Sequence, residues 1–376
     1  MQDGTLLALA AKGVLIAALP LVYVWRSRAP DKFRKLAWVT AFLTFDLIIL
    51  GGFTRLTDSG LGCPDWPGCY GHSNPLSAGE AIRAAETAQP TGPVTMGKAW
   101  VEMLHRYFAL AVGVLIIVLT ALAWQRWLRE RTRSPLLATV ILAWVCLQGA
   151  FGAWTVTQKL QPVFVTAHLL GGLTLLGLLV WLAQRESRSL PAVGIRGLRG
   201  AGAVALVVLL LQVALGGWVS SNYAVMACPD FPLCQGSLAP QGMDFEHGFT
   251  LWRDLGMTGG EGARPIPFPA LIAIHWVHRF FAIVAATVLA WFAWRACAYP
   301  ATRSGGFWLA SLLVVQLLTG MSNVVFQWPL LLAVMHNAGA AAMIAVVVSL
   351  NYRVWRQLPQ RAVSASASAA SVRAAE

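Results

Sequence analysis

Nine long runs of mostly apolar residues follow one another along the chain, separated by polar loops. Each run is long enough for a helix to cross a bilayer, which takes about 20 residues. Backbone polar groups cannot stay unpaired in lipid, so the runs predict helices and not isolated strands. The predicted spans are 5–25, 36–54, 101–124, 136–157, 162–183, 201–221, 270–294, 307–327 and 331–351. The pattern therefore predicts an all-α polytopic membrane protein.

Composition supports this fold class. Hydrophobic residues make up 57% of the 376 residues and charged residues 12%, against about 45–50% and about 25% in soluble domains. These values exclude a soluble Rossmann enzyme, a disulfide scaffold and a disordered chain. The first run has no basic segment before it and no clear cleavage site, so we interpret it as a helix and not as a signal peptide.

The charges indicate an orientation. Nineteen Lys and Arg residues lie in the loops on one side of the predicted topology, and six lie in the opposite, longer loops. The positive-inside rule then predicts a periplasmic N-terminus and a cytoplasmic C-terminus, in a multi-pass protein of the bacterial inner membrane. This asymmetry explains the net charge of +12 by contact with the lipid bilayer, so no nucleic-acid partner is expected.

Four features recur in the same order in the two halves of the chain. They are the strings CPDWPGC and CPDFPLC at 63–69 and 228–234, the glycine pairs at 51–52 and 216–217, the strings LHRYFAL and VHRFFAI at 104–110 and 277–283, and His168 with His336. Their offsets lie between 165 and 173 residues. The repeat predicts two pseudo-symmetric four-helix bundles in parallel orientation, preceded by one extra helix.

The repeat and the spans together divide the chain. The predicted segments are an extra transmembrane helix with a basic cytoplasmic loop at 1–35, a first four-helix half at 36–200, a second at 201–352, and an Ala/Ser-rich cytoplasmic tail at 353–376. The tail cannot bury a core and is expected to be disordered. Two long loops, about 55–100 and 222–269, are predicted to lie outside.

Four histidines lie inside predicted spans, namely His105, His168, His278 and His336. Each is one to two turns from the outer end of its helix, roughly 6–10 Å deep. Ionisable residues inside a membrane are costly and usually functional. A zinc cage would need further Cys or carboxylate ligands nearby, whereas two neutral imidazoles from opposing helices suit the axial positions of a heme iron. No Cys-x-x-Cys-His string is present, so a non-covalent, b-type heme is predicted in each half. His72 and His247 fall in loops and are expected to be solvated.

An arginine follows two of these histidines directly. Arg106 and Arg279 can pair heme propionates, or can extend to lipid headgroups. Glu102 lies three residues before His105, and its counterpart in the second half is His275. This difference predicts a reactive site in the first half and a structural or redox site in the second. The alternative is that Glu102 only pairs with Arg106 on the same helix face.

The positions of the cysteines agree with the predicted membrane topology. Two pairs, Cys63–Cys69 and Cys228–Cys234, lie in the outer loops, where disulfides persist. Metal ligation and redox-active thiols are the alternatives for these pairs. The single residues Cys146 and Cys297 are expected to pack against neighbouring helices. Asp46 lies in the middle of a span, where an interhelical hydrogen bond is the ordinary expectation and a proton path the alternative.

The sequence resembles the heme A synthase family in four features. They are the string GGFTRLTDSGL at 51–61, the paired Cys loops, the string EMLHR at 102–106 and the three other membrane histidines. The resemblance covers about residues 36–351. It implies oxidation of the C8 methyl of heme O to a formyl group, which gives heme A for cytochrome c oxidase. The departure is the first span, since the family pattern has eight helices and this sequence predicts nine.

The resemblance also assigns residues and partners. It implies a substrate heme at His105 and His168 with Arg106 beside it, and a bis-His heme b at His278 and His336 with Arg279. The carboxylate maps onto Glu102, and two loop disulfides map onto the Cys pairs. Heme O is then the substrate and heme A the product, heme O synthase is the expected substrate donor, and assembly of cytochrome oxidase is the expected context. An electron donor is also required, which the sequence does not name.

Two other classes of function remain at this point. A quinol-linked diheme b carrier would pass electrons without altering heme, but a symmetric relay does not require the difference between Glu102 and His275. A transporter would rest on Asp46 and the parallel repeat alone. The porphyrins extracted from the protein distinguish these classes, because only the synthase leads to heme O or heme A beside heme b.

Overall fold

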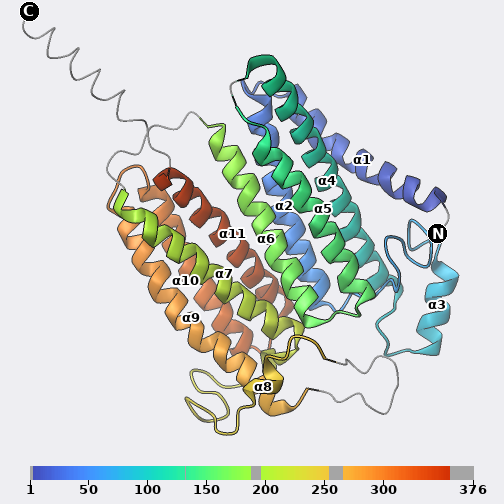
Figure 1. The fold of residues 1–376 in the computed structure, drawn as a ribbon. Helices are drawn as coiled ribbons and strands as arrows, with labels where there is room; N and C mark the ends of the chain where they lie inside the picture. Colours follow the sequence, from blue (N-terminus) through green and yellow to red (C-terminus); the bar gives the residue numbers. More distant parts are fainter. Residues whose placement is uncertain (1–2, 132, 188–195, 254–265, 356–376) are drawn as a thin grey trace, which may run out of the picture.

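The computed structural model describes residues 3–131, 133–187, 196–253 and 266–355. Within these ranges the chain is helical and forms no strand (Figure 1). The helices there that are long and apolar enough to cross a membrane number nine. They are α1 (Asp3–Arg26), α2 (Lys32–Leu56), α4 (Met96–Glu130), α5 (Leu136–Thr157), α6 (Pro162–Arg185), α7 (Arg199–Ser221), α9 (Phe268–Cys297), α10 (Arg303–Val325) and α11 (Leu330–Trp355). The predicted class, an all-helical polytopic membrane protein, is confirmed.

The shorter helices belong to the two long loops. These are α3 (Gly79–Ala88) and η2 (Ala224–Met226) with α8 (Phe245–Gly248), and α3 and α8 lie at the same end of the long helices (Figure 1). The one-turn helix η1 (Arg196–Leu198) precedes α7. The tail predicted at 353–376 lies outside the described residues, except that its first three residues continue α11 to Trp355.

Contacts between helices form two rings. In the first ring, each of α2, α4, α5 and α6 packs against two other helices of that ring. The second ring is formed in the same way by α7, α9, α10 and α11. In this arrangement α4 and α6 stand on opposite corners, as do α9 and α11. The rings meet where α11 packs against α2 and α6, and where α6 packs against α7.

Helix α1 lies outside the first ring, against α4. A Cβ atom added to Gly13 would lie 2.8 Å from Cβ of Leu110, so glycine is what allows the two helices to approach this closely. Polar groups of α1 also hold the first long loop. The Thr5 hydroxyl donates to the carbonyl of Gly71 at 2.7 Å, and Nζ of Lys12 donates to the carbonyl of Ser73 at 2.7 Å. The extra helix is therefore an integral support of the first half.

Local signals explain where two helices of the first ring begin. The Asp31 carboxylate accepts a hydrogen bond from the backbone N–H of Arg34 at the start of α2. The Thr95 hydroxyl accepts one from the N–H of Lys98 at the start of α4. Side chains of this kind satisfy donors that have no partner inside a helix. The start of α4 in turn sets the level at which His105 lies in the bundle.

Candidate functional site

The four membrane histidines come from the diagonal helices of the two rings. His105 lies on α4 and His168 on α6, while His278 lies on α9 and His336 on α11. The members of each pair therefore come from opposite corners of the same four-helix ring. Each imidazole keeps some accessible surface although its helix is packed on several sides. The histidines are thus paired as the sequence predicts, one pair in each ring.

Each imidazole packs against a glycine on the next helix. A Cβ atom at the glycine would lie within 3.0–3.2 Å of Cε1 of the ring, which is tighter than ordinary contact. The four glycine–histidine pairs are Gly51–His105, Gly152–His168, Gly216–His278 and Gly320–His336. The repeated glycine pairs of the sequence therefore have a steric purpose, because any larger residue would displace the ring.

The second glycine of each repeated pair serves the contact between the rings. A Cβ atom at Gly52 would lie 2.9 Å from Nδ2 of Asn337, the residue after His336. A Cβ atom at Gly217 would lie 3.0 Å from Cδ2 of Leu169, the residue after His168. In each repeat, the first glycine thus makes room for a histidine of its own four-helix ring. The second glycine makes room for a residue of the opposite four-helix ring.

Three glutamines hold three of the histidines. The carboxamide nitrogen of Gln148 donates to the carbonyl of His168 and lies 3.0 Å from its Nδ1. Gln212 bonds the carbonyl of His278 at 3.3 Å, 3.2 Å from Nδ1. Gln316 bonds the carbonyl of His336 at 3.0 Å. Sequence reasoning missed these residues, although Gln148 and Gln316 both stand twenty residues before a histidine.

This donor set fits a heme better than a metal cage. Throughout the described ranges, no three His, Cys, Asp or Glu side chains gather in a way that could hold a metal ion. Paired imidazoles from diagonal helices, each against a glycine, match the two axial ligands of a heme in a helix bundle. The predicted ligand chemistry is therefore compatible with both rings.

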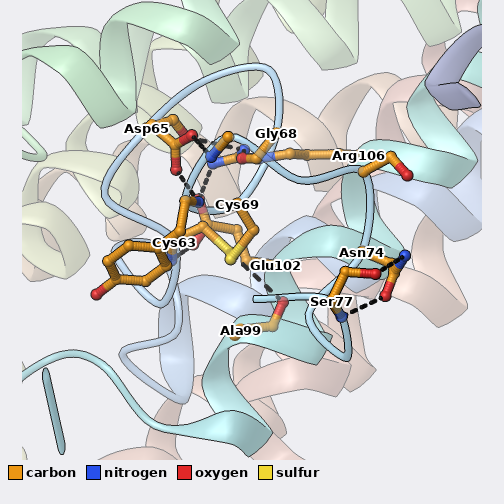
Figure 2. Close-up of a disulfide and its surroundings, with 12 residues drawn as sticks. Cys63, Asp65, Gly68, Cys69, Asn74, Ser77, Ala99, Glu102 and Arg106 are labelled. Carbon is orange, nitrogen blue, oxygen red and sulfur yellow. Dashed lines mark hydrogen bonds and ion pairs between the residues drawn. A yellow bond between two sulfur atoms is a disulfide. The ribbon is translucent and has the colours of Figure 1, made fainter. Parts of the chain in front are cut away.

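Glu102 is buried and ties the first Cys loop to α4. Its Oε2 accepts a hydrogen bond from the backbone N–H of Cys63 at 2.8 Å, and its Oε1 forms an ion pair with Arg106. Figure 2 shows Arg106 reaching along the loop, where Nη1 donates to the carbonyls of Asp65, Pro67 and Gly68. The ion pair with Arg106, which was the alternative interpretation of Glu102, is thus present. Glu102 also contacts the loop at Cys63, which the sequence did not reveal.

The second half repeats this arrangement with a histidine in place of the carboxylate. Nε2 of His275 accepts a hydrogen bond from Nε of Arg279 at 3.2 Å. The Arg279 guanidinium donates to the carbonyls of Cys228, Asp230 and Leu233. Both arginines are therefore loop anchors, and the fixed carboxylate is what distinguishes the first half.

An aspartate closes the turn in each Cys loop. Asp65 accepts hydrogen bonds from the N–H groups of Tyr70 and Gly71, and Asp230 accepts the equivalent bonds in the second loop. The N–H of Gly236 and other backbone donors hold the pKa of the Asp230 carboxyl below its ordinary value. The two loops therefore share one construction.

Both cysteine pairs lie at bonding distance. The Cα atoms are 4.9 Å apart in the Cys63–Cys69 pair and 4.6 Å apart in the Cys228–Cys234 pair. All four side chains are buried. The pairing within each loop agrees with the sequence prediction, and the described residues supply no third ligand for metal binding at either pair.

We expect mass mapping of unreduced protein to show the bridges Cys63–Cys69 and Cys228–Cys234. Each pair is joined inside one short loop that an arginine and an aspartate already fix, so pairing between the loops would require both loops to unfold. Protein that is unfolded and alkylated without reduction should leave these four thiols unmodified and label the free thiols of Cys146 and Cys297, which serve as the internal control. Four alkylated loop thiols, or a bridge between the loops, would contradict the assignment.

Three polar expectations have mixed outcomes. His72 and His247 are exposed in the loops, as predicted. Cys146 is exposed on α5, so the packing role predicted for it is wrong, whereas Cys297 is half-buried. Asp46 is exposed on α2, and the structure shows no interhelical hydrogen bond to it in the described ranges. An exposed residue on a membrane helix has no neighbouring helix to pack against.

The chain is similar to known proteins over most of its length. Residues 34–348 match the family model described as cytochrome oxidase assembly protein. The chain belongs to this family. The chain is also similar to the heme A synthase of Shewanella oneidensis, with 36% identity over 329 residues, 86% of this chain and 98% of the relative. The heme A synthase of Sphingopyxis alaskensis is 29% identical over 353 residues, 87% of this chain and 93% of the relative. The family match begins inside α2 and therefore leaves α1 outside.

Proposed function

We propose that the protein is a heme A synthase, an oxidoreductase that converts the C8 methyl of heme O to the formyl group of heme A. The observation that carries the proposal is the unequal pair of histidine sites. Both rings hold two imidazoles against glycines, but only the first has a buried carboxylate, Glu102, one turn from an axial candidate. The name shared by the relatives supports the same activity, and the electron-carrier alternative has no support among them.

The four histidines would divide into a substrate site and a cofactor site. His105 and His168 would bind heme O through the iron, and His278 and His336 would hold a resident heme b. When bound, heme b supplies reversible one-electron chemistry. Conversion of a methyl to a formyl group removes four electrons from the substrate, so an external acceptor or oxidant must take part.

The polar residues beside the histidines would orient the substrate and manage charge. Glu102 is fixed by Cys63 and Arg106, so its carboxylate would stay at one position near the ring edge, where it could stabilise positive charge or accept a proton. A guanidinium carries five N–H groups. Arg106 and Arg279 can therefore hold loop carbonyls and still meet a heme propionate.

The proposal also assigns a role to each segment of the chain and a membrane location to the protein. Residues 36–200 would form the substrate half, residues 201–352 the heme b half, and residues 1–35 the accessory helix with its loop. The protein would lie in the bacterial inner membrane with both Cys loops in the periplasm and the C-terminus in the cytoplasm, as the charge distribution favours. Heme O synthase would supply the substrate, and cytochrome oxidase would receive the product.

Co-expression tests the activity directly. We expect membranes that contain this protein and a heme O source, in a host without its own heme A synthase, to yield heme A when their porphyrins are extracted and separated. Membranes with the heme O source alone are the control and should hold heme O and heme b. Heme O and heme b without heme A, at normal levels of the protein, would contradict the proposal.

A further inference from the structure

The helices that face the histidines share one more position. In three of them a glutamine stands four residues, about one helical turn, before the glycine that receives the ring. The pairs are Gln148–Gly152, Gln212–Gly216 and Gln316–Gly320. On α2 the equivalent residue, four before Gly51, is Leu47. The motif is therefore complete in three helices and lacks its carboxamide in one.

The loss of the carboxamide changes the surroundings of one histidine. Gln148, Gln212 and Gln316 each contact a ring nitrogen and the carbonyl of their histidine, at 2.5–3.3 Å. His336 also has the Thr319 hydroxyl 3.1 Å from Nδ1. Nδ1 of His105, by contrast, is buried and has no hydrogen-bond partner. His105 is thus the one membrane histidine of the four whose ring is positioned by packing alone.

A hydrogen-bond partner beside a metal-binding imidazole matters because it sets the orientation of the ring. Each of the three glutamines acts through its carboxamide nitrogen, which donates to the histidine carbonyl. The same nitrogen lies beside Nδ1 of His168 and of His278, and beside Nε2 of His336. Loss of this kind of partner typically weakens metal binding by about 10–100-fold. A bond from His105 to a heme iron would therefore be the weakest of the four.

We propose that Leu47 makes His105 a labile axial ligand, so that the first half exchanges its heme while the second half retains its own. The identity of the ligand rests on the proposed function. A substrate heme has to enter and its product has to leave, and a weak bond on one face lets the heme go while His168, held by Gln148, still guides it. In the second half Gln212 and Gln316 support both ligands, as a permanent cofactor requires. Leu47, Gln148, Gln212 and Gln316 are positioning residues in this scheme.

Release of protoheme tests the proposal without turnover. The full-length protein, loaded with protoheme in detergent, is mixed with excess apomyoglobin, and transfer is followed in the Soret band. We expect two first-order phases for the unmodified protein. The variant His278→Ala, which lacks the second site, assigns the fast phase to the first half.

The decisive variant restores the missing carboxamide. Leu47→Gln is expected to slow the fast phase by about 10–100-fold, whereas Leu47→Met, which matches the size without an amide, should leave it unchanged. Gln212→Leu makes the reverse change in the other half and should accelerate the slow phase by a similar factor, so the test stands even if Leu47→Gln fails to fold. Equal release rates for the two halves, or Leu47→Gln and Leu47→Met releasing at the same rate, would overturn the proposal.

The result of the heme-release test can be distinguished from the result of the test of the proposed function. If co-expressed membranes make no heme A but the two halves release protoheme at the expected different rates, the activity is refuted and the lability of His105 stands. If heme A is made and both halves release protoheme equally, the activity stands and the role of Leu47 is refuted.

Discussion

Replacing His278 or His336 with Ala is expected to remove the low-spin heme b from the purified protein. Each side chain would supply one of the two protein bonds to the iron, and each imidazole packs closely against a glycine, which has no side chain to replace it. Loss of one imidazole therefore removes an iron bond and opens a gap beside Gly216 or Gly320. Heme content by the pyridine hemochrome method and the low-spin absorption spectrum measure the effect.

The loop histidines provide a matched control for these two variants. His72 and His247 are exposed and lie outside the long helices, so His72→Ala and His247→Ala should keep the full low-spin signal. Comparable expression of all four variants would show that loss of heme is not loss of folding. Full retention of the low-spin spectrum in both His278→Ala and His336→Ala would refute the assignment of the second site.

Glu102→Gln is expected to leave both hemes bound and to reduce the ratio of heme A to heme O by a factor on the order of 10²–10³, the usual effect of removing one preorganised electrostatic contact. Glu102 is no axial ligand, so heme binding should persist. The glutamine side chain keeps the shape and the acceptor for the N–H of Cys63, and it loses the negative charge. The variant Glu102→Ala should block product equally, but it also frees the loop.

Loop displacement has to be separated from loss of charge. Asp65→Asn alters a carboxylate within the first Cys loop, which caps the turn of that loop through the N–H groups of Tyr70 and Gly71. This variant should convert heme O at a nearly normal rate. If Asp65→Asn blocks product as strongly as Glu102→Gln does, the loop and not the charge is responsible. An unchanged ratio in Glu102→Gln, with normal protein levels, would reduce Glu102 to the ion-pair partner of Arg106.

Features dictated by the membrane were predictable from the sequence. The apolar runs placed all nine long helices, because lipid leaves the backbone no alternative to a helix. Their ends were less certain, since a polar segment can continue a helix beyond the bilayer. Thus α4 continues to Glu130, six residues after the run that predicted it, and α11 continues to Trp355.

Features that depend on contacts between helices were not predictable in the same way. A single glutamine in a span, such as Gln212, reads as an ordinary polar residue until one knows which histidine its helix faces. The loop contacts of Arg106 were hidden for the same reason, because the carbonyls that it binds lie about forty residues away. Asp46 shows the opposite error, since a polar residue inside a span does not imply a neighbour that can bond it.

The glycine pairs also set how the two histidine sites communicate. Gly51 touches His105 and Gly52 touches the residue after His336, while Gly216 touches His278 and Gly217 touches the residue after His168. Two routes of the same kind thus connect the sites. Each is made of two close contacts and two peptide bonds, one within the glycine pair and one between the histidine and the residue after it. The glycines have no side chain whose rotation could change these contacts. The spacing between the two histidine sites is therefore set largely by backbone packing at the glycine pairs.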